Sequence, residues 1–454
     1  MKRMRVLLII STAFLIAFSL SFIRNKKPEK KKFFKEGRKI GIVSKGVPLI
    51  YGSTPYKEDE ILVKFKPSVS SEQIQIKIAS YETEIKHIIP EIKIYQLKLP
   101  DGYTVEEMIQ VYNENPDVEF AEPNYVAYGA TIPNDPYFYM QYALHNTGQV
   151  FAPRYGIKGK QGADINAPEA WNKEIGEESI IIAIVDSGVD YNHPDLKDKV
   201  ISKGRDFVNG DYDAMDDLIH GTFVAGIAAA DTNNSLGIAG VSWKSKLLPV
   251  KVLDKENKGY WSWIAEGTIW AANQGAKVIN LSIAGELSRT MEEAINYVYN
   301  KGCVVVAAAG NKGKAVSYPA AFDKVLAVAA TNYNDERVSF SNTEGSWASN
   351  YGPEIDVAAP GFLVLSCVPV WWANQKGWTR PYGYWSGTSF AAPHVAGMAA
   401  LILSQKPWLT NSQVMDIIRL CTDDVNKNVH PGKDNFLGYG RINMEKAFKI
   451  FRKQ

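Results

Sequence analysis

From residue 167 onward, short apolar runs alternate with segments whose apolar positions repeat with the period of a helix. We expect strands at residues 180–185, 245–252, 278–283, 303–309 and 325–329. We expect helices between them at residues 221–230, 261–274, 291–300 and 389–404. This alternation predicts the α/β class, with a doubly wound, mostly parallel sheet covered by helices on both faces. Ligands of such sheets bind at the carboxyl ends of the strands.

Residues 58–128 show a different pattern, in which strands and helices are closely interleaved. Strands are expected at residues 61–66, 92–99 and 118–125. One helix should start after an N-cap at Ser70 or Ser71 and run to Tyr81, and a second should cover residues 105–115. The pattern predicts a small α+β domain of the ferredoxin-like kind. Breaks in regular structure at residues 129–136 place its end near residue 128, so residues 129–454 form the second domain.

The first 27 residues form an export segment. Lys2, Arg3 and Arg5 precede an uncharged apolar run at residues 6–23. About 18 apolar residues also approach the length of a spanning helix, so a cleaved signal peptide and a retained membrane anchor both remain open. Residues 28–57 form a basic linker. We therefore expect an exported protein, either secreted or associated with the cell envelope.

Composition adds the general class. The 454 residues exceed the size at which a single hydrophobic core stops growing, which agrees with more than one folded unit. With 46% hydrophobic residues and a net charge of +2, the chain is an ordinary globular protein, and nothing marks it as a nucleic-acid binder. The three cysteines, Cys303, Cys367 and Cys421, have no metal-ligand or redox spacing and are expected to be isolated thiols.

Two motifs place an acid and a base where strands and helices meet. The run Ile-Ile-Ala-Ile-Val-Asp-Ser-Gly puts Asp186 at the end of a buried strand, where it can orient another side chain; alone, such an Asp is more often a cap or turn residue. His220-Gly221-Thr222 puts an imidazole directly before a helix of small residues. Histidine suits proton transfer near neutral pH. His193 and His394 are expected to be structural.

The most specific stretch is Gly-Thr-Ser-Phe-Ala-Ala-Pro-His-Val-Ala-Gly, which contains Ser389. This serine opens a helix that is apolar on every side and must be buried. Its hydroxyl therefore lies at the positive end of the helix dipole, with its own N–H available to an oxyanion. Read alone, Ser389 is more often an N-cap. Asn311, after a buried strand and Gly310, could equally be a left-handed turn residue.

Together, Asp186, His220 and Ser389 resemble the motifs of the subtilase family of serine proteases, and their order along the chain is the subtilisin order. The similarity covers about residues 133–450 and is greatest to thermitase-like members. It implies a subtilisin-like fold and a serine endopeptidase that forms an acyl-enzyme on Ser389. His220 would be the general base and then acid, Asp186 would orient the imidazole, and Asn311 would be an oxyanion donor.

Other reaction classes fit less well. An α/β-hydrolase would need a second glycine where Ala391 stands and a different order of the triad. Nucleotide enzymes would need a glycine-rich phosphate loop after a strand, which is absent from the sequence. A catalytically silent scaffold of the same family should have lost at least one of the four chemical residues.

The resemblance also implies where a peptide substrate binds. Ser282, Ile283, Ala284 and Gly285 would line the first specificity pocket, and Ala284 stands where glycine is common. Gly259, Tyr260 and Trp261 match the edge strand of the family and would supply an aromatic wall. Phe223 and Phe390 replace a common histidine and a common methionine. The aromatic-rich loop at residues 362–386 is longer than usual and either shapes the leaving-group side or packs on itself.

Two further expectations come from the resemblance. Residues 58–128 resemble the inhibitory propeptide of the family, which would assist folding, occupy the cleft and be cut off by Ser389 between residues 127 and 133. A structural calcium ion is also implied. Its ligands would come from Asp135, Asp195, Asp231, Asn234, Leu236 and Ile238, the last two and Asp231 through main-chain carbonyls. The expected partners are protein or peptide substrates and the protein's own propeptide.

Overall fold

The computed structural model describes residues 56–125, 131–153, 156–343 and 345–450. The predicted export segment, nearly all of the basic linker and most of the predicted cleavage region lie outside the described residues. Within the described ranges, no helix combines the length and the apolar character needed to cross a bilayer.

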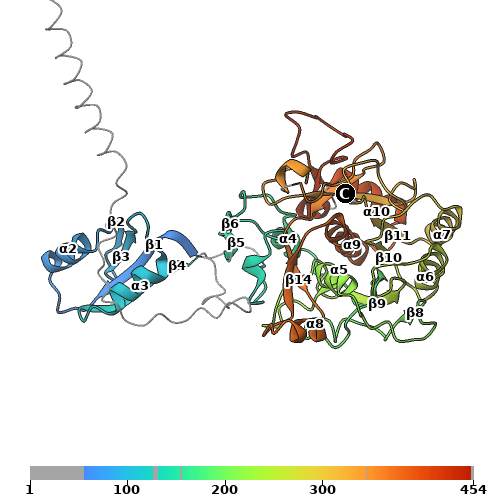
Figure 1. Ribbon diagram of the computed structural model, residues 1–454. Helices are drawn as coiled ribbons and strands as arrows, with labels where there is room; N and C mark the ends of the chain where they lie inside the picture. The colour runs from blue at the N-terminus through green and yellow to red at the C-terminus, as the bar shows by residue number, and fades with distance from the viewer. Residues whose placement is uncertain (1–55, 126–130, 154–155, 344, 451–454) are drawn as a thin grey trace, which may run out of the picture. The chain divides into compact units, whose positions relative to one another are not determined.

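An N-terminal α+β unit spans residues 56–125 (Figure 1). Its chain order is β-α-β-β-α-β, and its antiparallel sheet has the order β2-β3-β1-β4. This is the expected ferredoxin-like arrangement, with one strand, β2, that the sequence analysis did not predict. Ser70 and Thr104 cap its two helices with reciprocal side-chain bonds to Gln73 and Glu107. The elements are β1 (Tyr56–Phe65), α2 (Ser71–Ser80), β2 (Glu84–Ile89), β3 (Ile94–Lys98), α3 (Val105–Asn113) and β4 (Val118–Tyr125).

A nine-stranded sheet organises the C-terminal unit, residues 131–450, in the order β16-β17-β13-β12-β11-β10-β7-β9-β8. All neighbouring strands run parallel except β16 and β17. The strands are β7 (Ile181–Asp186), β8 (Arg205–Asp206), β9 (Lys246–Lys251), β10 (Val278–Leu281), β11 (Val304–Ala308), β12 (Leu326–Thr331), β13 (Val357–Pro360), β16 (Thr422–Asp423) and β17 (Arg441–Ile442). The doubly wound, mostly parallel sheet is confirmed.

Helices cover both faces of this sheet and create two cores. Along β7, Ile182 and Ile184 enter the core that contains α5 and α9, whereas Ala183 and Val185 enter the core that contains α6 and α7. Successive strand residues point to opposite faces, so a strand buried on both sides must be apolar throughout. Figure 1 shows α6 and α7 side by side at one edge of the unit. The four helices are α5 (His220–Ala229), α6 (Trp261–Asn273), α7 (Arg289–Asn300) and α9 (Thr388–Gln405).

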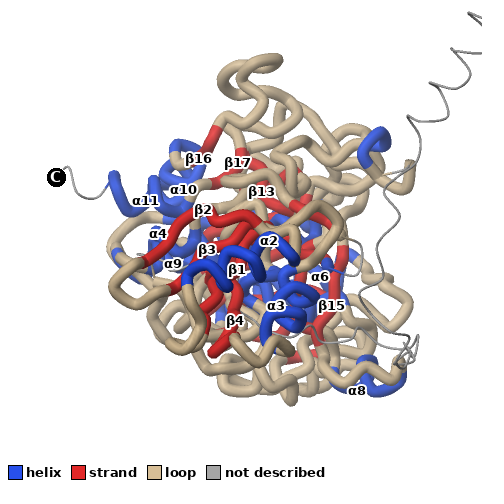
Figure 2. Tube along the Cα trace, turned by 90° about the vertical axis from the view of Figure 1, so that its left-hand side faces the viewer, coloured by secondary structure: helices blue, strands red, loops and turns tan. Residues whose placement is uncertain are grey.

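Smaller elements complete the unit, joined by long loops that are tan in Figure 2. They are η1 (Phe138–Met140), β5 (Val150–Ala152), β6 (Ile157–Lys158), α4 (Ala167–Trp171), η3 (Phe340–Asn342), β14 (Val364–Cys367), α8 (Val370–Gln375), β15 (Tyr382–Trp385), α10 (Asn411–Leu420) and α11 (Met444–Ile450). The three cysteines are free and buried, as expected. Burial raises the pKa of Cys303 to about 11 and that of Cys421 to about 12, and it also raises the pKa of Cys367.

Candidate active site

Asp186 and His220 meet at the carboxyl end of the central strand β7. Asp186 is the last residue of β7 and is fully buried, and His220 is the first residue of α5. The imidazole Nδ1–H donates to Asp186 Oδ1, with 2.7 Å between the two atoms, and the Ser187 N–H donates to the same oxygen at 2.8 Å. The carboxylate therefore fixes both the orientation and the tautomer of the ring.

Gly221 allows this approach. A methyl group on Gly221 would lie 2.0 Å from the carbonyl oxygen of Gly188 and 3.2 Å from Cβ of Asp186. The Gly221 N–H also donates to the hydroxyl of Ser187 at 2.9 Å. Only glycine lets the start of α5 lie directly against the loop that follows Asp186. This is the physical reason for the His-Gly pair that the sequence displays.

A second buried carboxylate, Asp216, holds the turn that precedes His220. Its Oδ1 accepts hydrogen bonds from Leu218 N, Ile219 N and the Ser187 hydroxyl, all at 2.9 Å. Its Oδ2 accepts from the N–H and the hydroxyl of Thr222, at 2.9 and 2.6 Å. Ile219 has φ 132°, which is far outside the usual range of a β-branched residue. Such strain persists only where neighbouring groups hold it in place.

The charge environment favours a protonated imidazole. Burial alone would lower the pKa of His220, but the charge of Asp186, its hydrogen bond and the charge of Asp216 outweigh this and raise the pKa above its ordinary value. The imidazole is thus suited to accept a proton near neutral pH. The sequence analysis did not identify Asp216, because nothing in the sequence Asp-Asp-Leu-Ile-His distinguishes this buried residue from its exposed neighbour Asp217.

Ser389 lies in the first turn of α9, after Gly387 at the N-cap. Its hydroxyl donates to the carbonyl oxygen of Ser282 at 3.2 Å, and the Ser282 hydroxyl donates back to the Ser389 carbonyl at 2.7 Å. The ring of the next residue, Phe390, lies 5.4 Å from the His220 ring between centroids. Among the described residues, no hydrogen bond joins His220 to Ser389 in this rotamer of the serine.

Asn311 is fixed beside the same helix start. Its Oδ1 accepts from both the N–H and the hydroxyl of Thr388, each at 2.9 Å, and the Gly310 N–H donates to that hydroxyl at 3.1 Å. With Oδ1 so occupied, the amide cannot turn over without losing two hydrogen bonds. Its Nδ2 lies 3.5 Å from where a methyl on Gly387 would stand, so the donor faces the segment that carries Ser389. Sequence reasoning had assigned no role to Thr388.

One of the two segments expected to bind substrate, residues 282–285, begins beside Ser389. Gly285 pairs with Tyr318 through two main-chain hydrogen bonds of 2.8 and 3.1 Å, and a methyl on Gly285 would lie 2.6 Å from the indole of Trp261. Ala284 is exposed, and Tyr260 exposes 68% of its surface. Tyr260 has extended backbone angles, but Trp261 already begins α6. The edge-strand geometry expected for residues 259–261 therefore ends at Tyr260.

The expected calcium residues come together only in part. Asn234 Nδ2 lies 3.3 Å from both Asp195 Oδ1 and Asp231 Oδ2, and Asp195 Oδ2 accepts from Ile238 N at 3.0 Å. Asp135 Oδ1 is buried and lacks a partner, and burial raises the pKa of Asp135 to about 7, opposed by backbone hydrogen bonds. An orphaned, desolvated carboxylate oxygen fits a cation ligand. Among the described residues, no group of three or more Asp, Glu, His or Cys side chains is placed to hold a metal ion. Amide and carbonyl oxygens would therefore have to complete the set of calcium ligands.

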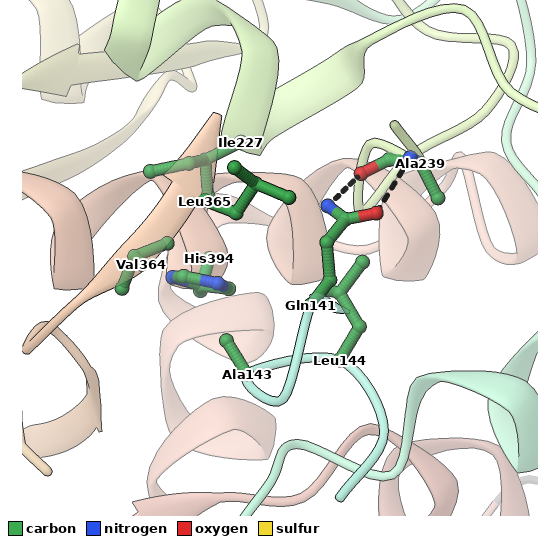
Figure 3. A pocket seen from close by; sticks show the side chains of 8 residues that line it. All are labelled: Gln141, Ala143, Leu144, Ile227, Ala239, Val364, Leu365 and His394. Carbon is green, nitrogen blue, oxygen red and sulfur yellow. Dashed lines mark hydrogen bonds between the residues drawn. The ribbon is translucent and has the colours of Figure 1, made fainter. Parts of the chain in front are cut away.

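Two other histidines are built into the core, as expected. His394 is buried, its Nδ1–H donates to the carbonyl of Phe390 at 2.8 Å, and it lines a small internal pocket with Val364 and Leu365 (Figure 3). His193 is buried between the Pro381 carbonyl and the Asp195 N–H. Burial lowers the pKa of both rings to about 4. Neither is suited to accept a proton from Ser389 at neutral pH.

Comparison with known proteins identifies the family. Residues 177–440 match the model of the subtilase family, which is more than half of the chain. The chain is a subtilase. Residues 51–124 of this subtilase match a fervidolysin N-terminal prodomain. The protein is thus a serine protease of the subtilisin family with an N-terminal prodomain.

Relatives support this assignment. The subtilase is 40% identical to a thermophilic serine proteinase of Bacillus sp. (strain AK1) over 86% of its own chain and 88% of the relative. It is 42% identical to thermitase of Thermoactinomyces vulgaris over 69% and 98% of the two chains. Fervidolysin from Fervidobacterium pennivorans, a solved structure described as a keratinolytic enzyme related to subtilisin, superposes with a TM-score of 0.55 and 28% identity over 87% of this chain and 61% of that one.

Proposed function

We propose that this subtilase is an endopeptidase in which Asp186, His220 and Ser389 form the catalytic triad and Asn311 donates to the oxyanion. The observation that carries the proposal is the 2.7 Å hydrogen bond between His220 and the buried Asp186, placed at the carboxyl end of β7. His220 uses its Nδ1–H for Asp186, so the neutral ring carries no proton on Nε2 and can act there as a base.

The proposed reaction follows from these positions. Ser389 Oγ leaves the Ser282 carbonyl, attacks the scissile carbonyl carbon and gives its proton to His220 Nε2. Substrate-free enzymes often lack a catalytic hydrogen bond that forms when substrate binds. The tetrahedral oxyanion accepts hydrogen bonds from Asn311 Nδ2 and from the Ser389 N–H in the first turn of α9.

The second half restores the enzyme. His220 passes its proton to the leaving amine, which departs and leaves an acyl group on Ser389 Oγ. Water then loses a proton to His220 and attacks the acyl carbon, and the proton returns to Ser389 as the acid product leaves. Asp186 stays ionised and stabilises the imidazolium in both halves.

Substrate would bind as an extended strand along residues 282–285, held by main-chain hydrogen bonds. The exposed methyl of Ala284 narrows the first pocket, so the largest aromatic side chains should be accepted less readily. In the other segment expected to bind substrate, residues 259–261, Tyr260 and Trp261 form an aromatic wall. Position 285 requires glycine because the Trp261 indole occupies the space beside it.

We also propose that a calcium ion stabilises the fold near Asp135, Asp195 and Asn234. The unpartnered Asp135 oxygen supports this, because a cation would compensate its burial. Asn234 would have to turn its amide so that Oδ1 faces the ion. Carbonyls of residues 231, 236 and 238 would complete the oxygen shell. The ion would contribute stability and would take no part in the chemistry.

The protein is made, in this proposal, as an exported precursor that removes its own prodomain. The basic residues and apolar run at residues 1–27 support export, and the prodomain match at residues 51–124 supports a precursor. One related protein is named a halolysin-like extracellular serine protease. The proposal allows two fates for the apolar run, cleavage as a signal peptide or retention as a membrane anchor. Domain boundaries at residues 27, 57 and 128 are part of the same proposal.

One experiment tests both catalysis and processing. Wild type and Ser389→Ala precursors are expressed side by side, and chain mass and peptide hydrolysis are followed over time. Wild type should lose its N-terminal part with a cut between residues 127 and 133 and should hydrolyse peptides, whereas the variant should do neither. Equal processing of both chains would refute self-cleavage, and equal peptide hydrolysis would refute Ser389 as the nucleophile.

A further inference from the structure

Residues 364–385 form an aromatic hairpin that sequence reasoning treated as a loop. Strands β14 and β15 pair in antiparallel register from Val364 with Trp385 to Cys367 with Tyr382, and α8 lies between them. Trp372 packs against Trp378 and Trp385, with 4.9 and 5.6 Å between ring centroids. Trp371 exposes 41% of its surface and donates its indole N–H to the Asp216 carbonyl at 2.9 Å.

The hairpin lies directly against α5, the helix that begins with His220. The Ser366 hydroxyl donates to the carbonyl of Phe223 at 2.7 Å, in the first turn of that helix. At Gly226, one turn further, a methyl group would lie 2.5 Å from Ser366 Oγ and 2.9 Å from Cys367 Sγ. Helix and hairpin therefore touch without space for even one additional carbon, so a shift in one must move the other.

The hairpin also holds the strained turn before His220. The Asp216 carboxylate accepts hydrogen bonds from Leu218 N and Ile219 N within this turn. The Trp371 indole N–H, from α8, donates to the Asp216 carbonyl. The neighbouring Val370 N–H donates to Asp190 Oδ2 at 2.8 Å, in the loop that follows Asp186. The loop that follows Asp186 and the turn that precedes His220 are thus both bonded to α8. A strained residue such as Ile219 needs such outside support to keep its conformation.

Aromatic rings continue this contact to the imidazole itself. The Trp385 ring lies 5.4 Å from that of Phe223, Phe223 lies 4.6 Å from Phe390, and Phe390 lies 5.4 Å from His220. Each pair is within the distance at which aromatic rings attract one another. The imidazole therefore packs on the last of a continuous series of rings that starts in the hairpin.

We propose that the aromatic hairpin is a positioning element for His220, and that the hydrogen bond from Trp371 to the Asp216 carbonyl is its principal contact. The inference rests on the proposed function, because it assigns a role relative to the catalytic base. The hairpin acts through the turn and through α5, and it touches neither the reacting atoms nor, in this proposal, the substrate. Small displacements of a catalytic group lower turnover strongly, which is why such support matters.

The test variant is Trp371→Phe, which keeps an aromatic ring and removes the N–H donor together with part of the indole. Trp408→Phe is the matched control, because Trp408 is 71% exposed and contacts Lys406. Two substrates are compared, a peptide p-nitroanilide, which has no residue beyond the scissile bond, and an internally quenched peptide with several residues there. We expect Trp371→Phe to lower kcat about fivefold on both substrates with KM within about twofold, a change that corresponds to about 1 kcal/mol. Trp408→Phe should match wild type.

Ser366→Ala provides a second, independent variant in case Trp371→Phe folds poorly, and thermal unfolding is measured for every chain. It should also lower kcat on both substrates. A rise in KM on the quenched peptide alone would show that the hairpin is a substrate wall and would overturn the proposal. Unchanged kinetics with a lower unfolding temperature would overturn it as well, because the hairpin would then serve stability only. If Ser389→Ala equals wild type on both substrates, the proposed function itself fails, and this outcome is distinct from the others.

Discussion

Replacing Asn311 measures what its amide contributes to the transition state. The structure separates its two halves, since Oδ1 is bonded twice to Thr388 while Nδ2 faces the Ser389 segment. Asn311→Leu removes the donor, and we expect kcat to fall about 100- to 1,000-fold, or about 2.7–4 kcal/mol, with KM almost unchanged. KM should stay constant because the donor acts on charge that develops only during the reaction.

Thr388 offers a graded check of the same reasoning. Thr388→Val removes one of the two bonds that hold Asn311 Oδ1 and deprives the Gly310 N–H of its acceptor. One neutral hydrogen bond contributes about 1 kcal/mol, so kcat should fall about fivefold. Thr388→Ser keeps the hydroxyl and should stay within about twofold of wild type.

The assay is initial-rate hydrolysis of a peptide p-nitroanilide over a range of concentrations, with active enzyme counted by titration. If Asn311→Leu left kcat within about threefold of wild type, or if the loss appeared in KM alone, the amide would not be the transition-state donor. If Thr388→Ser lost as much as Thr388→Val, the hydroxyl would not be what orients Asn311.

Three further predictions concern charge, packing and the metal. Because Asp216 helps to raise the pKa of His220 and catalysis needs the neutral ring, kcat/KM should fall as pH drops through a midpoint above 6.5, and Asp216→Asn should move this midpoint to lower pH. Gly226→Ala should destabilise the fold by about 1–3 kcal/mol in denaturant unfolding, and adding Ser366→Ala should recover part of that loss, since Ser366 Oγ is the nearest atom. Calcium at 100 times its Kd should raise the unfolding temperature by about 4 °C, and Asp135→Ala should abolish the response to calcium and to chelator.

Most of the sheet was predictable where both faces of a strand are buried, but β13 was missed although all four of its residues are buried. Largely apolar runs identified β7, β9, β10, β11 and β12, because a polar residue on either face has to be buried, as Asn280 is in β10. Strand β2 was missed because all of its residues are exposed at the edge of the small sheet. The hairpin of β14 and β15 was missed because each strand has only four residues, too few to show an alternation of apolar and polar positions.

The candidate site was predictable to the extent that its residues lie in motifs. Asp186 ends a strand, His220 and Ser389 lie at the starts of helices, and Asn311 lies in the loop after a strand, so their positions indicated a shared edge of the sheet. Their supporting groups could not be found this way. The buried Asp216, the Trp371 donor and the bond from Thr388 to Asn311 depend on which segments meet in three dimensions, and residue types alone do not specify those meetings.

The three buried thiols give the protein an internal reporter of its own motions. With their pKa values far above neutrality, Cys303, Cys367 and Cys421 hold almost no thiolate while folded, so an alkylating reagent can modify them only during transient opening. They lie before β11, in the aromatic hairpin and at the end of α10. The rate at which each one is labelled would therefore give the free energy of opening at three separate places in the native enzyme, without the introduction of any probe.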